Sequence, residues 1–236
     1  MKKVLLCFCI LLLLCAGKTM AQFRNSRFGL NFSPNIGWLK PGVVGEVYKS
    51  NGILAGFSYG GVFEHYFIPN LALVTGFNIL QTGGHLQYRS VEETTPGVED
   101  TGILSRRYNL QYIEIPLMLK GSTGTLLGKF SFFGKLGIGN GFNIKAKKKD
   151  DFLVSRTQIT ISSDSKSAKK DVSFFRESLI IGIGAEYTLG KTAILQFGLT
   201  FSNGFTDILT GNNNYTPLAK EKAISNYVEL NIGVLF

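Results

Sequence analysis

Apolar and polar residues alternate along most of the sequence after residue 22, and this period of two is typical of β-strands with unlike faces. The last stretch, ISNYVELNIGVLF, places apolar residues at alternate positions from Val228 to Phe236, with Glu229 and Asn231 between them. No helical period and no second domain are evident. The alternation predicts eight strands, at 27–38, 52–67, 71–82, 108–120, 128–143, 174–189, 192–205 and 225–236.

The connections between these strands alternate in length. Three are short, at 68–70, 121–127 and 190–191, and four are long, at 39–51, 83–107, 144–173 and 206–224. Outer-membrane barrels have this asymmetry, with short periplasmic turns and longer extracellular loops. The sequence therefore predicts an all-β protein, an eight-stranded antiparallel up-and-down transmembrane β-barrel located in the cell outer membrane.

The two faces of the predicted strands differ in bulk as well as in polarity. One face carries mainly Phe, Leu and Ile, such as Phe132 and Phe197, whereas the other carries polar residues and most of the strand glycines. The interior of an eight-stranded barrel is only just wide enough for side chains to fill it. The bulky face is therefore predicted to contact lipid, and the small and polar face to fill the barrel.

Composition agrees with a membrane β-protein. Charged residues make up 17% of the chain, against about 25% in a typical soluble domain, and aromatic residues make up 12%. Outside the N-terminus, no apolar run approaches the ~20 residues that a spanning helix needs.

Residues 1–21 are predicted to be a cleaved signal peptide, and 22–236 the barrel domain. Lys2 and Lys3 precede an apolar stretch at 4–16, and Thr19-Met20-Ala21 fits a small-x-small cleavage site. An uncleaved anchor is the alternative, but the apolar run is short for one. All three cysteines lie in this segment, so the mature chain is expected to have no disulfide and no thiolate metal site.

The stretch QYIEIPLMLK at 111–120 resembles the "YxEIPLLLK" strand of the PorT-like outer-membrane β-barrel family. The terminal strand, which is apolar at alternate positions and ends on Phe236, resembles the sorting signal recognised by the barrel assembly machinery. The resemblance implies an eight-stranded barrel in a diderm envelope, and the namesake of the family is tied to type IX protein export. No residue of this sequence carries that role over.

Six polar residues on the inward face form the predicted lumen polar network: Glu64, Glu114, Lys135, Glu186, Glu229 and Asn231. Counting along the strands puts Glu114, Lys135 and Glu229 at similar depth, with Lys120, Lys129 and Arg176 as further partners nearer the rims. Buried charges must pair or be neutralised. The network is therefore predicted to be a salt-bridged plug, and a cation or proton site built from surplus carboxylates is the alternative.

The long connection at 144–173 has eight basic and four acidic residues, hence a net charge of +4. Its most basic positions form a predicted basic external loop: Lys147, Lys148, Lys149, Lys169 and Lys170. On the outer surface such a loop would meet lipopolysaccharide phosphates, since polybasic segments are drawn to anionic head groups. A solvated loop is the alternative, and the compartment argues against nucleic acid as a partner.

Motifs for catalysis or cofactor binding are absent from the sequence. His85 with Ser90 is a weak candidate for lipid-modifying chemistry, because no orienting acid or oxyanion donor accompanies the pair. We therefore expect no metal, no cofactor and no catalytic site. The predicted role is structural or interactive, in envelope integrity, adhesion through an external protein partner, or an export assembly. A narrow gated pore is the first alternative, and a lipid-modifying enzyme is the second.

Overall fold

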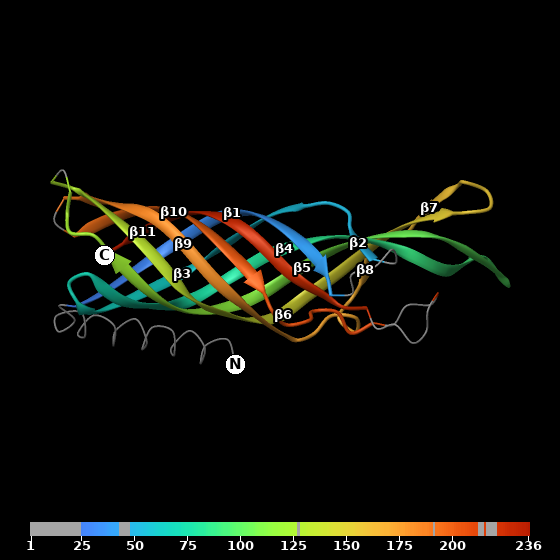
Figure 1. The fold of residues 1–236 in the computed structure, drawn as a ribbon, viewed down its shortest axis with the longest axis horizontal. Coiled ribbons are helices and arrows are strands. Elements are labelled where there is room, and N and C mark those ends of the chain that lie inside the picture. The colour runs from blue at the N-terminus through green and yellow to red at the C-terminus, as the bar shows by residue number, and fades with distance from the viewer. Residues whose placement is uncertain (1–24, 43–47, 127, 191, 212–214, 216–220) are drawn as a thin grey trace, which may run out of the picture.

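The protein is an eight-stranded antiparallel ring (Figure 1), which the computed structural model describes over residues 25–42, 48–126, 128–190, 192–211, 215 and 221–236. Each strand pairs with the next along the chain, and the last pairs with the first. The ring strands are β1 (Ser26–Pro41), β3 (Leu54–Ile68), β4 (Leu71–Thr95), β5 (Val98–Ser122), β6 (Phe130–Val154), β9 (Phe175–Leu189), β10 (Ala193–Gly204) and β11 (Ala223–Leu235). The predicted fold class is confirmed. The predicted signal peptide lies outside the described residues.

Ring closure is made by β1 and β11. Asn35 lies opposite Glu229 in this pair, and the Phe236 N–H donates to the Phe28 carbonyl at 2.7 Å. The chain ends at the same end of the barrel as the short turns, on the left in Figure 1. We call this the short-turn end and the opposite one the long-loop end. Over the part of the chain that is described, no helix is long and apolar enough to cross a membrane.

The barrel wall has the predicted orientation. Leu30, Phe132 and Phe197 point outward with 71%, 53% and 48% of their surface exposed, whereas Glu114 points inward and is 3% exposed. Along β1, the outward apolar side chains run from Phe28 to Trp38, ten residues further on. Ten residues of a strand tilted by ~40° rise about 25 Å, which matches the apolar band of outer-membrane barrels.

Pro116 interrupts the hydrogen-bond ladder between β4 and β5. The paired positions run from Leu71 with Gly121 to Thr75 with Leu117 and resume at Asn78 with Glu114. Two side chains supply donors in the gap: the Thr75 hydroxyl donates to the Pro116 carbonyl at 2.9 Å, and the Asn140 amide to the Ile115 carbonyl at 3.2 Å. The carbonyls beside the proline are thereby satisfied within the wall.

The prediction of a loop at 83–107 is wrong. Strands β4 and β5 continue beyond the barrel as one hairpin that turns at Pro96 and Gly97, and β6 continues through what was predicted as the start of the 144–173 loop. Three short strands flank this extension: β2 (Tyr48–Ser50) pairs with β4, while β7 (Thr160–Ser162) and β8 (Lys166–Ser167) pair with β6. Figure 1 shows the extension projecting from the long-loop end.

The error has a physical cause. On β5 the outward residues Ile113, Ile115 and Leu117 are apolar, whereas beyond Gln111 the apolar residues, such as Leu104, face inward. Within lipid the bulky residues must point outward, and within water they must point inward. The apolar side of the strand therefore changes at the membrane boundary, and the alternation loses its phase there.

An apolar cluster closes the long-loop end of the barrel. Tyr112 and Tyr227 lie in the ring itself, and Leu104 and Phe152 pack on the inward face of the extension. The connection between β10 and β11 contributes Ile208, which is 0% exposed, and Val172 bridges to Leu209. Polar and small residues thus fill the interior toward the short-turn end, while aromatic and aliphatic residues cover the interior at the long-loop end.

The wall orientation can be tested with two arginine substitutions on the same face of β5. Leu117→Arg should cost ~2–4 kcal/mol of folding free energy, because it places a charge in the apolar band. Asn109→Arg is the matched control, at an exposed position on the extension, and should cost ~0–1 kcal/mol. Urea unfolding in lipid vesicles measures both values, and equal costs would contradict the assigned boundary.

Candidate functional site

The interior of the barrel holds three layers of charged and polar side chains. The layer at the short-turn end is centred on Lys120, which is 1% exposed. Its ammonium donates to both carboxylate oxygens of Glu64, at 2.6 and 2.8 Å, and also to Glu186. Arg27 donates to Glu186 at 3.4 Å, and Tyr66 donates to Glu64 at 2.9 Å. Two buried carboxylates therefore share one buried lysine, with Arg27 at the rim.

The middle layer joins Lys135, Glu229 and Asn231. Lys135 donates to the Asn231 side-chain oxygen at 3.2 Å, and the Asn231 amide donates to Glu229 at 2.9 Å and to Ser33 at 3.0 Å. Ser58 donates to the second Glu229 oxygen at 3.0 Å. The layer borders a cavity of about 40 Å³, room for one to a few water molecules. Among the residues described, no carboxylate forms an ion pair with Lys135.

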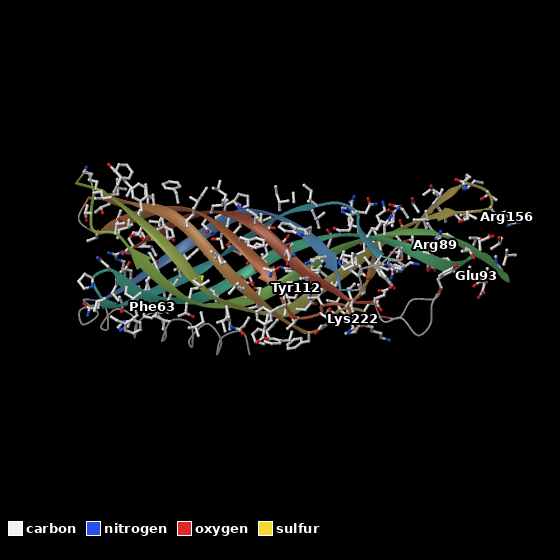
Figure 2. The ribbon with its side chains drawn as sticks, viewed as in Figure 1. Phe63, Arg89, Glu93, Tyr112, Arg156 and Lys222 are labelled. Atoms are coloured by element: carbon white, nitrogen blue, oxygen red, sulfur yellow. The ribbon has the colours of Figure 1, made fainter. Side chains whose placement is uncertain are left out.

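The upper layer is built on Arg176, which is fully buried. Arg176 donates to Glu114 at 2.9 Å, to the Ser202 hydroxyl at 3.0 Å and to the Ser225 carbonyl at 3.1 Å. Tyr227 donates to the other Glu114 oxygen at 2.9 Å. Above this layer lies Tyr112, which Figure 2 labels near the middle of the ribbon.

The structure places all six predicted network residues in the interior. It brings Glu114, Lys135, Glu229 and Asn231 to one cavity, and it puts Glu64 and Glu186 together near the short-turn end. The ion pairs go to Lys120 and Arg176, which the sequence predicts only as partners nearer the rims, and to Arg27, which it does not predict. Strand alternation could have identified Lys120 and Arg176 as interior, because position 120 lies on the same inward face as 114, and position 176 on the same inward face as 178.

The charges in the interior balance. Four carboxylates, from Glu64, Glu114, Glu186 and Glu229, face four cations, from Arg27, Lys120, Lys135 and Arg176. Among the described residues of these three layers, carboxylates and cations are thus equal in number, whereas the predicted cation or proton site would use surplus carboxylates. Within the described ranges, no group of three or more His, Cys, Asp or Glu side chains is arranged to hold a metal ion.

A fourth polar cluster fastens the connection between β10 and β11 over the barrel mouth. Glu221 accepts from the Tyr88 hydroxyl at 2.6 Å and from the Tyr108 hydroxyl at 3.4 Å. Arg106 lies 3.6 Å from Glu221 and forms a two-pronged ion pair with Asp150, at 2.7 and 2.8 Å. Burial, reinforced by Glu221, raises the pKa of the Tyr88 and Tyr108 hydroxyls, so both remain neutral donors. The alternation of the sequence does not predict this cluster.

The predicted basic loop is not one surface. Lys147 and Lys149 lie in β6 and point outward, whereas Lys148 points inward and pairs with Asp171 at 2.7 Å. Lys169 and Lys170 are exposed in a separate turn, where the Thr210 hydroxyl donates to the Lys170 carbonyl at 3.2 Å. The assignment of these five residues to a loop is thus wrong for the three in β6.

The structure separates His85 from Ser90. His85 lies on the outward face of β4 and accepts from Arg107 at 2.7 Å, and burial together with Arg107 lowers the pKa of its imidazole. Ser90 is on the inward face and donates to Glu92 at 2.7 Å. The pair therefore makes no common site. Phe236, the predicted assembly signal, is 64% exposed at the short-turn end.

A narrow ring with an apolar outer band and a polar interior defines a small outer-membrane β-barrel. The sequence profile of the outer membrane protein beta-barrel domain matches residues 20–210. The chain belongs to this family, and its location is the outer membrane. The long-loop end is accordingly extracellular and the short-turn end periplasmic.

Solved structures of bacterial outer-membrane proteins are similar in fold, while no curated protein matches the sequence. Neisserial surface protein A is 10% identical, with 88% of this chain and 95% of that chain covered and a TM-score of 0.44. OprG from Pseudomonas aeruginosa is 11% identical, with coverages of 90% and 96% and a TM-score of 0.41. Ail, the attachment invasion locus protein of Yersinia pestis, is 13% identical in its complex with the heparin analogue sucrose octasulfate, with coverages of 90% and 99% and a TM-score of 0.37.

The shared lysine of the periplasmic layer can be tested by substitution. Lys120→Met should destabilise the barrel by ~3–5 kcal/mol, because it leaves two buried carboxylates uncompensated. Lys135→Met should cost less, since Glu229 retains its bonds from Ser58 and Asn231. Lys169→Met, an exposed lysine, is the control and should leave stability unchanged. The measurement is the urea midpoint in lipid vesicles, and a Lys120→Met midpoint equal to that of the control would contradict the assignment.

Proposed function

We propose that the protein is a non-catalytic, non-conducting outer-membrane barrel that presents its extracellular β-extension to a protein partner. The observation that carries this proposal is the length and order of the extension. A two-residue turn suffices to join two antiparallel strands at the barrel rim. Here β4 and β5 instead run on to Thr95 and Val98.

Ordering a segment in water costs ~1–2 kcal/mol per residue in backbone entropy, so an ordered extension needs packing to maintain it. The inward face provides that packing through Leu104, Tyr108 and Phe152, which are 5% exposed or less. The tip keeps apolar residues exposed, with Ile159 at 60%, Val98 at 42% and Ile161 at 42%. An ordered surface that combines such residues with Glu93 and Arg156, labelled in Figure 2, fits protein contact.

A closed interior supports the non-conducting part of the proposal. The three polar layers and the aromatic cluster above them occupy the described barrel interior apart from a cavity of about 40 Å³, and eight-stranded barrels leave no aqueous channel. A gated pore would require these layers to move. The separation of His85 from Ser90 likewise favours a non-catalytic role over lipid modification.

Membership of the PorT-like group is part of the same proposal. It is supported by the strand at 111–120, in which Glu114 and Lys120 each anchor an interior layer. An accessory place in an export assembly would use the same extension as its contact surface. Adhesion and envelope integrity are the other forms that an interaction role would take.

The conductance prediction separates this role from a pore. The purified full chain, reconstituted in a planar bilayer, should give no single-channel steps at voltages up to 100 mV in either direction. Insertion is verified by flotation of parallel proteoliposomes and by the heat-dependent gel mobility of the folded barrel. Steady and reproducible steps from verified folded protein would refute the non-conducting role.

The contact prediction uses photo-crosslinking in intact cells. A photoreactive residue at Glu93, on the extension, should give discrete protein adducts, whereas one at Leu126, exposed near the periplasmic turns, should not give the same adducts. Replacing residues 92–100 by Asn-Gly, between the paired Val91 and Thr101, should keep the barrel folded. In that variant, a photoreactive residue at Ile161, on the remaining extension, should no longer give protein adducts. Unchanged capture by the shortened protein would count against the extension as the contact surface.

A further inference from the structure

Three neighbouring strands, β4, β5 and β6, change from mainly apolar to mainly polar outward residues at one hydrogen-bonded row, whereas β3 beside them stays apolar. Phe57 of β3, Gln81 of β4, Gln111 of β5 and Lys145 of β6 lie opposite one another in a single row. Below the row the outward residues of these three strands are mainly apolar, such as Ile115 and Ile138, which are 43% and 40% exposed. Above it they are mainly polar, beginning with Asn109 opposite Lys147. On β4, β5 and β6 the row therefore lies near the boundary between acyl chains and head groups.

A groove of about 420 Å³ lies on the outer surface at this boundary row, within the size range of small-molecule sites. Its lining is divided in the same way as the surroundings. Ala55 and Phe57 supply an apolar side, next to the lipid-facing wall. The amides of Gln81, Asn109 and Gln111 and the ammonium groups of Lys145 and Lys147 supply the polar side.

The lysines of the groove are available to a ligand. Neither Lys145 nor Lys147 forms an ion pair with a carboxylate in the described part of the chain, whereas Lys148 pairs with Asp171. A one-residue bulge on β6 causes this separation: Tyr112 lies opposite Asn143 but Gln111 lies opposite Lys145, so Ile144 is an extra residue. Beyond the bulge the odd-numbered lysines face outward, and Lys149, opposite Arg107, adds further positive charge above the groove.

We propose that this groove binds one phosphorylated glycolipid of the outer leaflet, of the lipopolysaccharide type. The lysines would hold a phosphate, the three side-chain amides match sugar hydroxyl and amide groups, and the apolar side continues into the region of the acyl chains. A phosphate alone would use only the lysines, and a simple phospholipid would leave the amides without partners. This site is independent of the partner proposed for the tip of the extension.

The test is a titration of the detergent-solubilised full chain with bisphosphorylated lipid A, followed by native mass spectrometry. Wild-type protein should saturate with one lipid A per chain. Each lysine near anionic head groups contributes roughly a 5-fold gain in affinity, so Lys145→Gln with Lys147→Gln should weaken binding about 30-fold. Lys169→Gln with Lys170→Gln is the matched control, with the same loss of charge outside the groove, and should bind as wild type.

Two further arms identify the ligand. Ala55→Trp, which fills the apolar side without altering charge, should also weaken lipid A binding. Dephosphorylated lipid A, phosphatidylglycerol and 10 mM inorganic phosphate should each bind or compete at least tenfold less well than lipid A. Folding of every variant is checked by heat-dependent gel mobility.

Three results would overturn the proposal: equal loss in both lysine pairs, undiminished binding by Ala55→Trp, or phosphatidylglycerol binding as tightly as lipid A. The first would show that net charge alone attracts the lipid. The second would show that the groove is not occupied, and the third that the sugar is not recognised.

Discussion

The structure depends on the requirement that every backbone polar group of the wall find its partner within the wall, because hydrocarbon offers none. Pairing of β1 with β11 removes the two edges that an open sheet would leave. Strand β5, which contains a proline, shows how strict this requirement is. Pro116 cannot donate, and the carbonyls around it are met by the Thr75 hydroxyl and the Asn140 amide. The proline of β5 is therefore accompanied by a polar side chain on each neighbouring strand, β4 and β6.

The small width of the ring also determines how the charged side chains in its interior are arranged. With space for little more than side chains, the charges that line it must find partners within it. Arg27, Lys120 and Arg176 pair directly with carboxylates, whereas Asn231 links Lys135 to Glu229. Lys120 and Arg176 are the anchors, since each binds groups from several strands. Such cross-ring bonds hold strands that the backbone ladder connects only to their immediate neighbours. They also occupy the space that a conducting channel would need.

Alternation in the sequence was sufficient to predict the ring, its strand number, its loop asymmetry and the direction of its faces. The alternation failed to predict the strands where they pass from lipid into water. On β4, Phe77 points outward into the apolar band, whereas Leu86 points inward beneath the extension, and the change of phase looked like the end of a strand. The prediction that the basic positions near Lys148 share one loop surface failed for a related reason. The bulge that orients them depends on pairing with the neighbouring strand, and no local pattern of residues marks it. Glu221 was missed because its partners, Tyr88 and Tyr108, are distant in sequence.

The bulge at Ile144 acts as a phase switch for everything that follows it on β6. If Ile144 instead paired regularly opposite Gln111, the even-numbered positions would face outward, and Lys148 and Asp150 would replace Lys147 and Lys149 at the cell surface. The same shift in pairing would turn two lysines toward the covered mouth and withdraw Asp150 from Arg106. A shift of one residue in strand pairing would thereby exchange a cationic exterior for a mixed one without altering any amino acid.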